Sequence, residues 1–160
     1  MTVKIVTDSL SDITSDIAQG LEITVVPCYV RFGEKVYRDR IEMTTDEFYY
    51  RLSHGATFPT TTQPSPGDFV DVYNRLAKET DEILVVTLSS KLSGTYQSAL
   101  HAKGMVQKEC RIEVIDSLTV VMGLGLIVIT AAKAAQAGAN LDEVADLVRR
   151  AVPRSHSIMF

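Results

Sequence analysis

The stretch Ile83-Leu84-Val85-Val86-Thr87-Leu88-Ser89-Ser90-Lys91-Leu92-Ser93-Gly94-Thr95-Tyr96-Gln97 decides the fold of this 160-residue chain. Its first six residues are mostly apolar and rich in β-branched side chains, which predicts a buried strand. A helical pattern then runs from Ser93 to about Lys108. A strand that passes directly into a helix directs unpaired N–H groups and the positive end of the helix dipole at one spot. The hydroxyl-rich junction therefore suits an anion such as a carboxylate or a phosphate.

Two other predicted strands both end in the dipeptide Asp-Ser. Val3–Thr7 runs into Asp8-Ser9, and Arg111–Ile115 runs into Asp116-Ser117. If the three strands are parallel, their carboxyl ends share one edge of the sheet, where open α/β sheets bind ligands. We therefore expect three hydroxyl groups to meet at that edge, those of Ser9, Ser93 and Ser117.

These serines also have a simpler explanation. A Ser or Asp directly after a strand often caps the helix that follows and binds nothing. Taken singly, Ser9 and Ser117 are better explained as caps. The segment Ser89–Thr95 contains more hydroxyls than one cap requires, which favours a binding role there.

The composition indicates one globular domain without an affinity for polyanions. At 46% hydrophobic residues the chain can bury one ordinary core. A net charge of −4 gives no electrostatic footprint for nucleic acid or an anionic membrane. Cys28 and Cys110 lie far apart among apolar residues, which predicts buried free thiols and a reducing, cytoplasmic location.

Neither the start of the chain nor its apolar stretches indicate targeting or membrane insertion. The sequence enters a strand at Val3 without the basic and apolar regions of a secretory signal. The uncharged run Ser117–Ala132 is shorter than the ~20 residues of a membrane span and predicts a buried helix. The last residues, His156–Phe160, are apolar and strand-like, so we expect the chain to be cut before a further domain.

The order of the remaining elements predicts an α/β fold with a mostly parallel sheet flanked by helices. Thr44 and Ser65 each begin a helix with a capping pattern, and a last helix runs from Asn140 to Pro153. Between the first strand and Thr44, Glu22–Val26 reads as a strand, and two short runs around Gly33-Glu34 read as a hairpin at the edge of the sheet. These runs are Cys28–Phe32 and Val36–Arg38.

Four motifs together resemble the bacterial DegV family of fatty-acid-binding proteins, and they occur in the family's order along essentially the whole chain. They are Val6-Thr7-Asp8-Ser9 with Asp12, Pro59-Thr60-Thr61-Thr62-Gln63-Pro64-Ser65-Pro66, Ser89-Ser90-Lys91-Leu92-Ser93-Gly94-Thr95-Tyr96-Gln97-Ser98-Ala99, and Ile115-Asp116-Ser117 followed by Gly123-Leu124-Gly125.

The resemblance implies a two-domain protein that encloses one long-chain fatty acid and needs no other cofactor. Residues 1–160 are similar to the first, α/β domain only. Members of the family present the bound acid to an ATP-using kinase subunit, which phosphorylates the carboxylate. The resemblance therefore implies a binding subunit that is not itself an enzyme. A form that lacks the second domain would expose apolar surface and self-associate.

The resemblance also assigns residues to the binding site. Ser93 matches the hydroxyl that holds the fatty-acid carboxylate, and Thr61 with Thr62 match the hydroxyl pair that supports it. Gly94 would let the backbone come close to the anion. The chain departs from the family at Val121, where members often have a serine, and it contains no counterpart of the basic and histidine residues of the second domain.

The apolar tail would need a slot next to these hydroxyls. Gly123 and Gly125 remove side-chain bulk from the predicted helix Thr119–Ala137, which is able to form the floor of such a slot. Close packing of the helix on the sheet explains the same glycines equally well.

The alternative class is an enzyme, either a serine-dependent hydrolase or a phosphoryl-transfer domain. A hydrolase needs a base beside its nucleophile, but His101 follows Ser93 at ~12 Å along a helix axis. The Gly-x-Ser-x-Gly elbow and the Gly-x-x-x-x-Gly-Lys nucleotide loop are absent from the sequence. A third interpretation makes Arg149, Arg150 and Arg154 a docking patch, although cations at a helix end more often complement its dipole.

Overall fold

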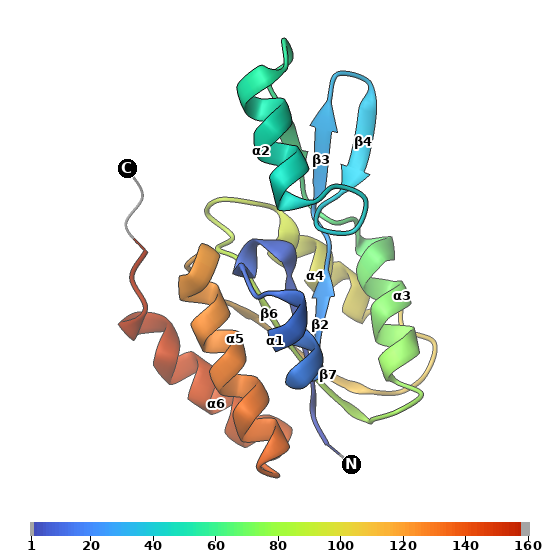
Figure 1. Ribbon diagram of the computed structural model, residues 1–160. Helices are drawn as coiled ribbons and strands as arrows, with labels where there is room; N and C mark the ends of the chain where they lie inside the picture. The colour runs from blue at the N-terminus through green and yellow to red at the C-terminus, as the bar shows by residue number, and fades with distance from the viewer. Residues whose placement is uncertain (1, 158–160) are drawn as a thin grey trace.

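A computed structural model describes residues 2–157 of the chain, which form both strands and helices (Figure 1). The strands are β1 (Lys4–Asp8), β2 (Ile23–Val26), β3 (Tyr29–Phe32), β4 (Lys35–Arg38), β5 (Thr60–Thr62), β6 (Glu82–Thr87) and β7 (Arg111–Asp116). The helices are α1 (Ser15–Gly20), α2 (Thr45–His54), α3 (Pro66–Leu76), α4 (Thr95–Lys103), α5 (Val121–Gln136) and α6 (Leu141–Ala151), with short 3₁₀ turns η1 (Ser9–Ser11) and η2 (Val152–Arg154).

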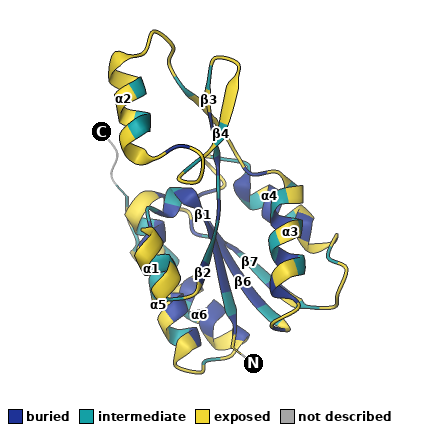
Figure 2. Ribbon diagram, turned by 45° about the vertical axis from the view of Figure 1, so that its right-hand side comes forward, coloured by how far each residue is buried: buried dark blue, intermediate teal, exposed yellow. Residues whose placement is uncertain are grey.

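The core is a parallel sheet in the order β2-β1-β6-β7, which confirms the α/β class. Alternate residues of a strand point to opposite faces. In β6, Leu84 and Val86 join the apolar cluster formed with α5 and α6, whereas Ile83 and Val85 join the cluster formed with α3 and α4. Figure 2 shows these central strands buried between the two layers of helices.

The predicted hairpin forms, but it is not an edge of the parallel sheet. β3 pairs with β4 and with β5 in a separate antiparallel sheet, which protrudes with α2 from the α/β body (Figures 1 and 2). Pro27 separates β2 from β3 and has no N–H for a sheet ladder. The next N–H, that of Cys28, donates to Ser9 Oγ at 3.1 Å. Pairing with the parallel sheet therefore stops at Val26.

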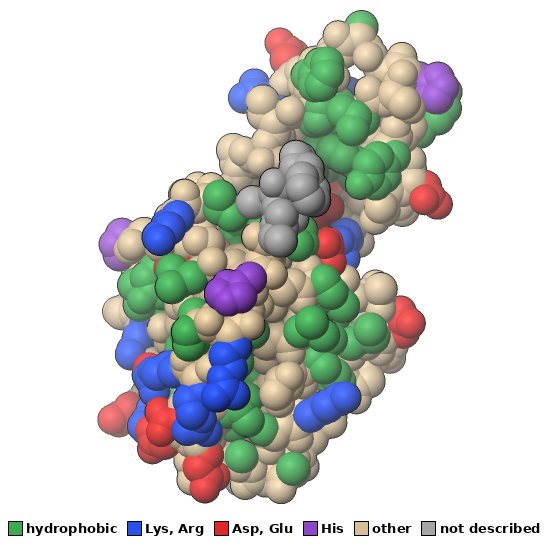
Figure 3. All heavy atoms as spheres, turned by 90° about the vertical axis from the view of Figure 1, so that its left-hand side faces the viewer, with side chains coloured by type: hydrophobic (Ala, Val, Ile, Leu, Met, Phe, Trp, Pro, Cys, Tyr) green, Lys and Arg blue, Asp and Glu red, His purple; other side chains and the backbone are tan. Residues whose placement is uncertain are grey.

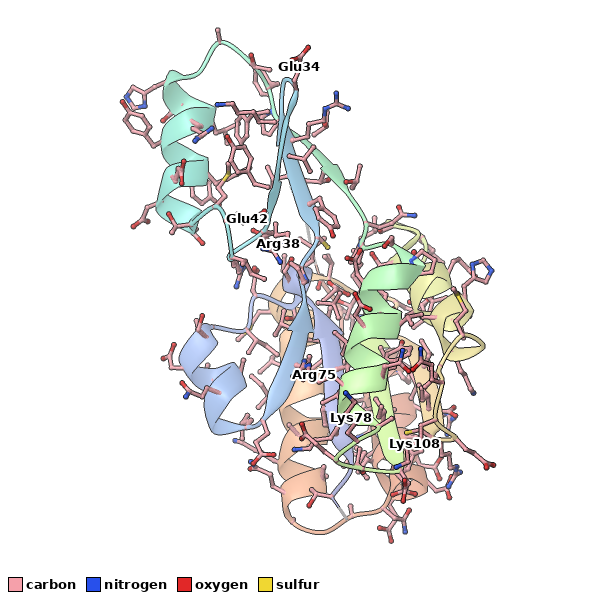
Figure 4. The ribbon with its side chains drawn as sticks, turned by 90° about the vertical axis from the view of Figure 1, so that its right-hand side faces the viewer. Glu34, Arg38, Glu42, Arg75, Lys78 and Lys108 are labelled. Atoms are coloured by element: carbon pink, nitrogen blue, oxygen red, sulfur yellow. The ribbon has the colours of Figure 1, made fainter. Side chains whose placement is uncertain are left out.

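An ion pair supports the base of the protruding part. Arg38 is the last residue of β4. Its backbone N–H donates to the Glu42 carboxylate at 2.8 Å, and its guanidinium donates to the same carboxylate at 3.0 Å. The two side chains point toward one another in Figure 4. The next residue, Met43, is 2% exposed and fixes the loop before α2 by burying its side chain.

Several boundaries differ from the sequence predictions. The helix predicted to reach Lys108 ends at Lys103, because the chain turns at Gly104. The sequence analysis missed α1 and also β5, whose three threonines lie between two prolines.

No helix within residues 2–157 has the length and hydropathy of a membrane span. The predicted terminal strand His156–Phe160 lies largely outside the described residues.

Candidate functional site

A cavity of about 290 Å³ lies where the protruding sheet meets the carboxyl edge of the parallel sheet. Three of the predicted binding residues line it: Thr61 and Thr62 come from β5, and Ser93 comes from the loop between β6 and α4. The other lining residues are mostly apolar and come from η1, from the ends of the strands and from the segment before α5. They are Leu10, Cys28, Gln63, Leu88, Leu92 and Val120.

Strand β5 brings the two threonines to the cavity. Thr61 is opposite Val30 and Thr62 is opposite Tyr29 in the antiparallel ladder with β3. The Tyr29 hydroxyl donates to Asp68 Oδ1 at 2.8 Å, and Asp68 also completes the capping box at the start of α3. β5 is therefore held along one side by β3, which the Tyr29–Asp68 bond ties to the start of α3, and the threonine residues remain exposed.

Thr95 orients the hydroxyl of Ser93, a role that the sequence analysis missed. Ser93 Oγ lies 3.0 Å from Thr95 Oγ1 and accepts the Thr95 N–H at 3.3 Å. Thr95 is fully buried, whereas Ser93 is half-buried at the cavity. When the Thr95 hydroxyl donates to Ser93, the single proton of Ser93 stays available for a ligand. The sequence feature that indicates this pairing is Ser93-Gly94-Thr95, which places two hydroxyls two residues apart at the start of a helix.

The backbone at the start of α4 is less open to an anion than the sequence suggests. The N–H of Ser93 donates to the Ser89 carbonyl oxygen at 3.2 Å and is not free for a ligand. At Gly94, an added Cβ would lie 2.5 Å from Gln63 Nε2. The glycine therefore admits the Gln63 side chain, whose amide lies over the beginning of the helix. Sequence reasoning did not identify Gln63 as part of the site.

The structure does not bring Ser9 or Ser117 into the cavity lined by Ser93. Ser9 is 2% exposed, its hydroxyl accepts the Cys28 N–H, and it lines a separate hollow of about 240 Å³. Ser117 is 1% exposed and its hydroxyl donates to the Thr119 carbonyl oxygen at 3.1 Å. Both hydroxyls serve the fold, although neither caps a helix: Asp8 caps η1 instead.

Two buried groups at or next to the cavity, the Asp8 carboxyl and the Cys28 thiol, have raised pKa values. Burial raises the pKa of the Asp8 carboxyl to about 6, although its hydrogen bonds from the N–H groups of Leu88 and Leu10 act in the opposite direction. Burial, and then the charge of Asp8, raises the pKa of the Cys28 thiol to about 12. Cys28 therefore stays protonated at neutral pH and is not a nucleophile. Cys110 is also free, but it is half-buried rather than buried as predicted.

The glycines of α5 serve packing. An added Cβ at Gly125 would lie 2.4 Å from the Ser11 carbonyl oxygen, so the glycine lets α5 approach η1 closely. An added Cβ at Gly123 would lie 2.6 Å from Thr119 Oγ1. This outcome agrees with the packing explanation of the two glycines rather than with a slot floor.

Apolar side chains are exposed on both parts of the molecule (Figure 3). On the protruding part, Tyr49 and Tyr50 of α2 are 61% and 65% exposed. On the body, exposed apolar residues follow the cavity-lining Val120 into α5. They are Val121, Met122 and Leu126. Val121 stands where a serine was expected from the resemblance, so this surface is more apolar than that pattern implies.

Neither His54 nor His101 lines the cavity that contains Ser93. His101 is exposed on α4, and the His54 ring stacks on Tyr50 at the end of α2. The described residues contain no group of three or more His, Cys, Asp or Glu able to hold a metal ion. Among the cations considered for docking, Arg149 pairs with Glu113 and Asp146, whereas Arg150 and Arg154 line an open hollow beside α5.

These features define an open-sheet α/β domain with a small hydroxyl-lined cavity at the carboxyl edge of its sheet. The model of the uncharacterised DegV family matches residues 2–160. A DegV domain-containing protein of Caldanaerobacter subterraneus is 44% identical over 98% of this chain and 55% of the relative. The chain therefore belongs to the DegV family. It spans about half the length of the curated relatives that it matches.

Solved structures of the family share the fold. A DegV family protein from Thermus thermophilus, reported with its fatty acid binding, is 38% identical with a TM-score of 0.86, covering 96% of this chain and 54% of that one. DegV from Bacillus subtilis, described as a fatty acid binding protein, is 31% identical with a TM-score of 0.87 over 94% and 54% of the two chains. A stearic acid-binding protein from Eubacterium ventriosum is 29% identical with a TM-score of 0.85 over 92% and 52%.

Proposed function

We propose that this domain holds a long-chain fatty acid by its carboxylate and presents it to a separate ATP-using kinase subunit, which forms the acyl phosphate. One observation carries the proposal: three hydroxyl-bearing residues, Thr61, Thr62 and Ser93, line one cavity whose other walls are mostly apolar. Hydroxyls that donate to a carboxylate contribute ~1.5–3 kcal/mol each when they are shielded from water. Donors beside apolar walls match the two ends of a fatty acid.

The tail would leave the cavity over the apolar residues at its rim. Leu92 lines the cavity and is 55% exposed, and Val120 leads into the exposed Val121 of α5. Each methylene that these side chains cover contributes ~0.8 kcal/mol. The cavity itself encloses only the head group. The affinity for a long acyl chain therefore depends on what packs over the apolar rim.

The relatives support the ligand and the domain assignment. Those from Thermus thermophilus, Bacillus subtilis and Eubacterium ventriosum are described as binding fatty acids, and this chain matches about half of each. We assign residues 1–160 to the first domain of such a protein, with the remaining half covering the acyl chain. The free thiols of Cys28 and Cys110 fit a reducing cytoplasm.

The domain binds and does not catalyse in this proposal. A hydroxyl nucleophile needs a base within hydrogen-bond reach, and the Ser93 hydroxyl has Thr95 as its partner. The kinase subunit therefore supplies the chemistry. Turnover of nitrophenyl acyl esters by this chain that is lost in Ser93→Ala would contradict this assignment and favour a hydrolase.

Titration calorimetry with palmitate and with its methyl ester tests the proposal. The ester keeps the acyl chain but lacks the charge that the three hydroxyls are proposed to hold. We expect palmitate to bind at least about tenfold more tightly, the effect of one lost charge-assisted hydrogen bond. Equal affinities for palmitate and its methyl ester would show that the cavity does not bind the carboxylate. Mass spectrometry of lipid that purifies with the chain gives an independent measurement.

A further inference from the structure

The loop between β6 and α4 has an acceptor for every backbone N–H from Leu88 to Ser93. A loop N–H without a partner in the protein must bind water, because an unpaired buried N–H is costly. Here two of the acceptors are carboxylates from neighbouring strands. The acceptors are Asp8 Oδ2 for Leu88, Thr119 O for Ser89, Asp116 Oδ1 for Ser90, Ser89 Oγ for Lys91, and Ser89 O for both Leu92 and Ser93.

The two carboxylates act in the same way from opposite sides. β6 lies between β1 and β7 in the sheet, and Asp8 and Asp116 are the last residues of those two strands. Asp8 accepts the N–H of Leu88 at 2.8 Å, and Asp116 accepts the N–H of Ser90 at 3.1 Å. A carboxylate that accepts an N–H forms a stronger hydrogen bond than a neutral group does.

Each carboxylate also accepts the backbone N–H of the residue two positions later in the sequence. Asp8 Oδ1 accepts the N–H of Leu10, and Asp116 Oδ1 accepts the N–H of Leu118, both at 3.0 Å. These local bonds alone would be ordinary turns after a strand. The additional bond to the β6 loop is what links each Asp to the segment that carries Ser93.

We infer that Asp8 and Asp116 are positioning residues, which clamp the loop Leu88–Ser93 between β1 and β7 and thereby fix the Ser93 hydroxyl in the cavity. The inference rests on the proposed function for its consequence in binding, but the clamp itself is a property of the loop. Leu10 and Leu88, whose N–H groups Asp8 accepts, also line the cavity. The clamp therefore fixes part of the apolar wall together with the hydroxyl.

Amide hydrogen exchange followed by NMR, with palmitate calorimetry on the same samples, tests this inference. Asp116→Asn is the main variant because Asp116 is only half-buried and its replacement is tolerated more easily than that of the buried Asp8. Asp8→Asn is the second variant. Asp142→Asn is the control for the loss of a carboxylate charge, because the partner of Asp142 is the Arg111 side chain rather than an N–H of the loop.

We expect exchange at Ser90 to rise about tenfold in Asp116→Asn, with exchange at Val85 in β6 unchanged, and palmitate affinity to fall by a similar factor. The corresponding amide in Asp8→Asn is that of Leu88. The control should change neither measurement. A merely structural role would raise exchange at Val85 as much as in the loop.

The two measurements separate this inference from the proposed function. Unchanged loop exchange in both clamp variants, or faster loop exchange with unchanged palmitate affinity, would overturn the positioning role. If the unsubstituted chain does not bind palmitate, the proposed function fails. The exchange data then decide whether the carboxylates hold the loop.

Discussion

The hydroxyl of Ser93 lies 3.0 Å from that of Thr95, and the Thr95 N–H donates to the same Ser93 oxygen at 3.3 Å. When the buried Thr95 hydroxyl donates in this pair, the proton of the half-buried Ser93 hydroxyl is left for a ligand. The pair belongs to the start of α4, so the first turn of a helix fixes the proposed anion donor. From this relationship we expect Ser93 to contribute more to ligand binding than the other hydroxyls of the cavity.

Ser93→Ala is expected to weaken palmitate binding by ~1–3 kcal/mol, because it removes a shielded donor to a charged group. The thermal midpoint should change little, since Ser93 is half-buried and its main-chain bond to Ser89 remains. Titration calorimetry and thermal unfolding measure the two effects. Ser90→Ala is the control, because the exposed Ser90 contributes its N–H rather than its hydroxyl to the loop. Equal palmitate affinity in Ser93→Ala and the unsubstituted chain would remove Ser93 from the site.

Asp8 should make the fold more stable as the pH falls from about 8 to about 5. Its pKa is raised from 3.8 to about 6 in the folded state, so the folded chain binds this proton more tightly than the unfolded chain. The associated stability is fully present below about pH 4 and is lost as the pH rises through about 6.

Urea unfolding at several pH values, compared between the unsubstituted chain and Asp8→Asn, isolates this contribution. The free energy of unfolding of the variant should show a flatter dependence between about pH 5 and 7, because the titrating group is gone. Parallel pH profiles for the two chains would mean that Asp8 titrates at its ordinary pKa.

Thr7→Val should leave the free energy of unfolding unchanged or raise it by up to about 1 kcal/mol. Thr7 is fully buried in β1, and within residues 2–157 its hydroxyl has no hydrogen-bond partner. An isosteric methyl group removes the cost of burying that hydroxyl. Thr80→Val is the matched control: Thr80 is 1% exposed, but its hydroxyl donates to the Thr2 carbonyl oxygen and accepts the Glu82 N–H. The control should lose ~1–2 kcal/mol in urea unfolding. A loss of the same size in Thr7→Val would contradict the prediction.

A chain extended to the full length of its relatives should bind palmitate more tightly than this one and self-associate less. Leu92 and Val121 are exposed near the proposed path of the tail, and covering them adds ~0.8 kcal/mol per buried methylene. Calorimetry and sedimentation of both forms at matched concentrations measure these effects. A monomer whose affinity equals that of the extended form would show that residues 1–160 form the complete site.

The sequence by itself determined the α/β class and singled out the loop Ser89–Thr95, which we propose binds the ligand. Residue patterns predict structure where the interactions that decide it are local. Runs of β-branched residues form strands, capping residues begin helices, and parallel strands need helical crossovers. The threonine pair was reached through the family motif rather than through local patterns. The segment Thr60–Thr62 has β-branched side chains, yet a strand of three residues lies below what periodicity detects.

Only the tertiary structure decided which hydroxyls reach the cavity and how they are held. Ser9 and Ser117 each follow a strand, but their hydroxyls already have partners within the fold. The Ser9 hydroxyl accepts the N–H of the distant Cys28, and the Ser117 hydroxyl donates to the nearby Thr119 carbonyl oxygen. Likewise, no spacing in the sequence shows that Asp8 accepts an N–H from Leu88, because the two residues meet only when β1 and β6 pair. Hydrogen bonds between segments distant in the chain depend on strand order and register, and these are set by packing the whole core rather than by any single stretch.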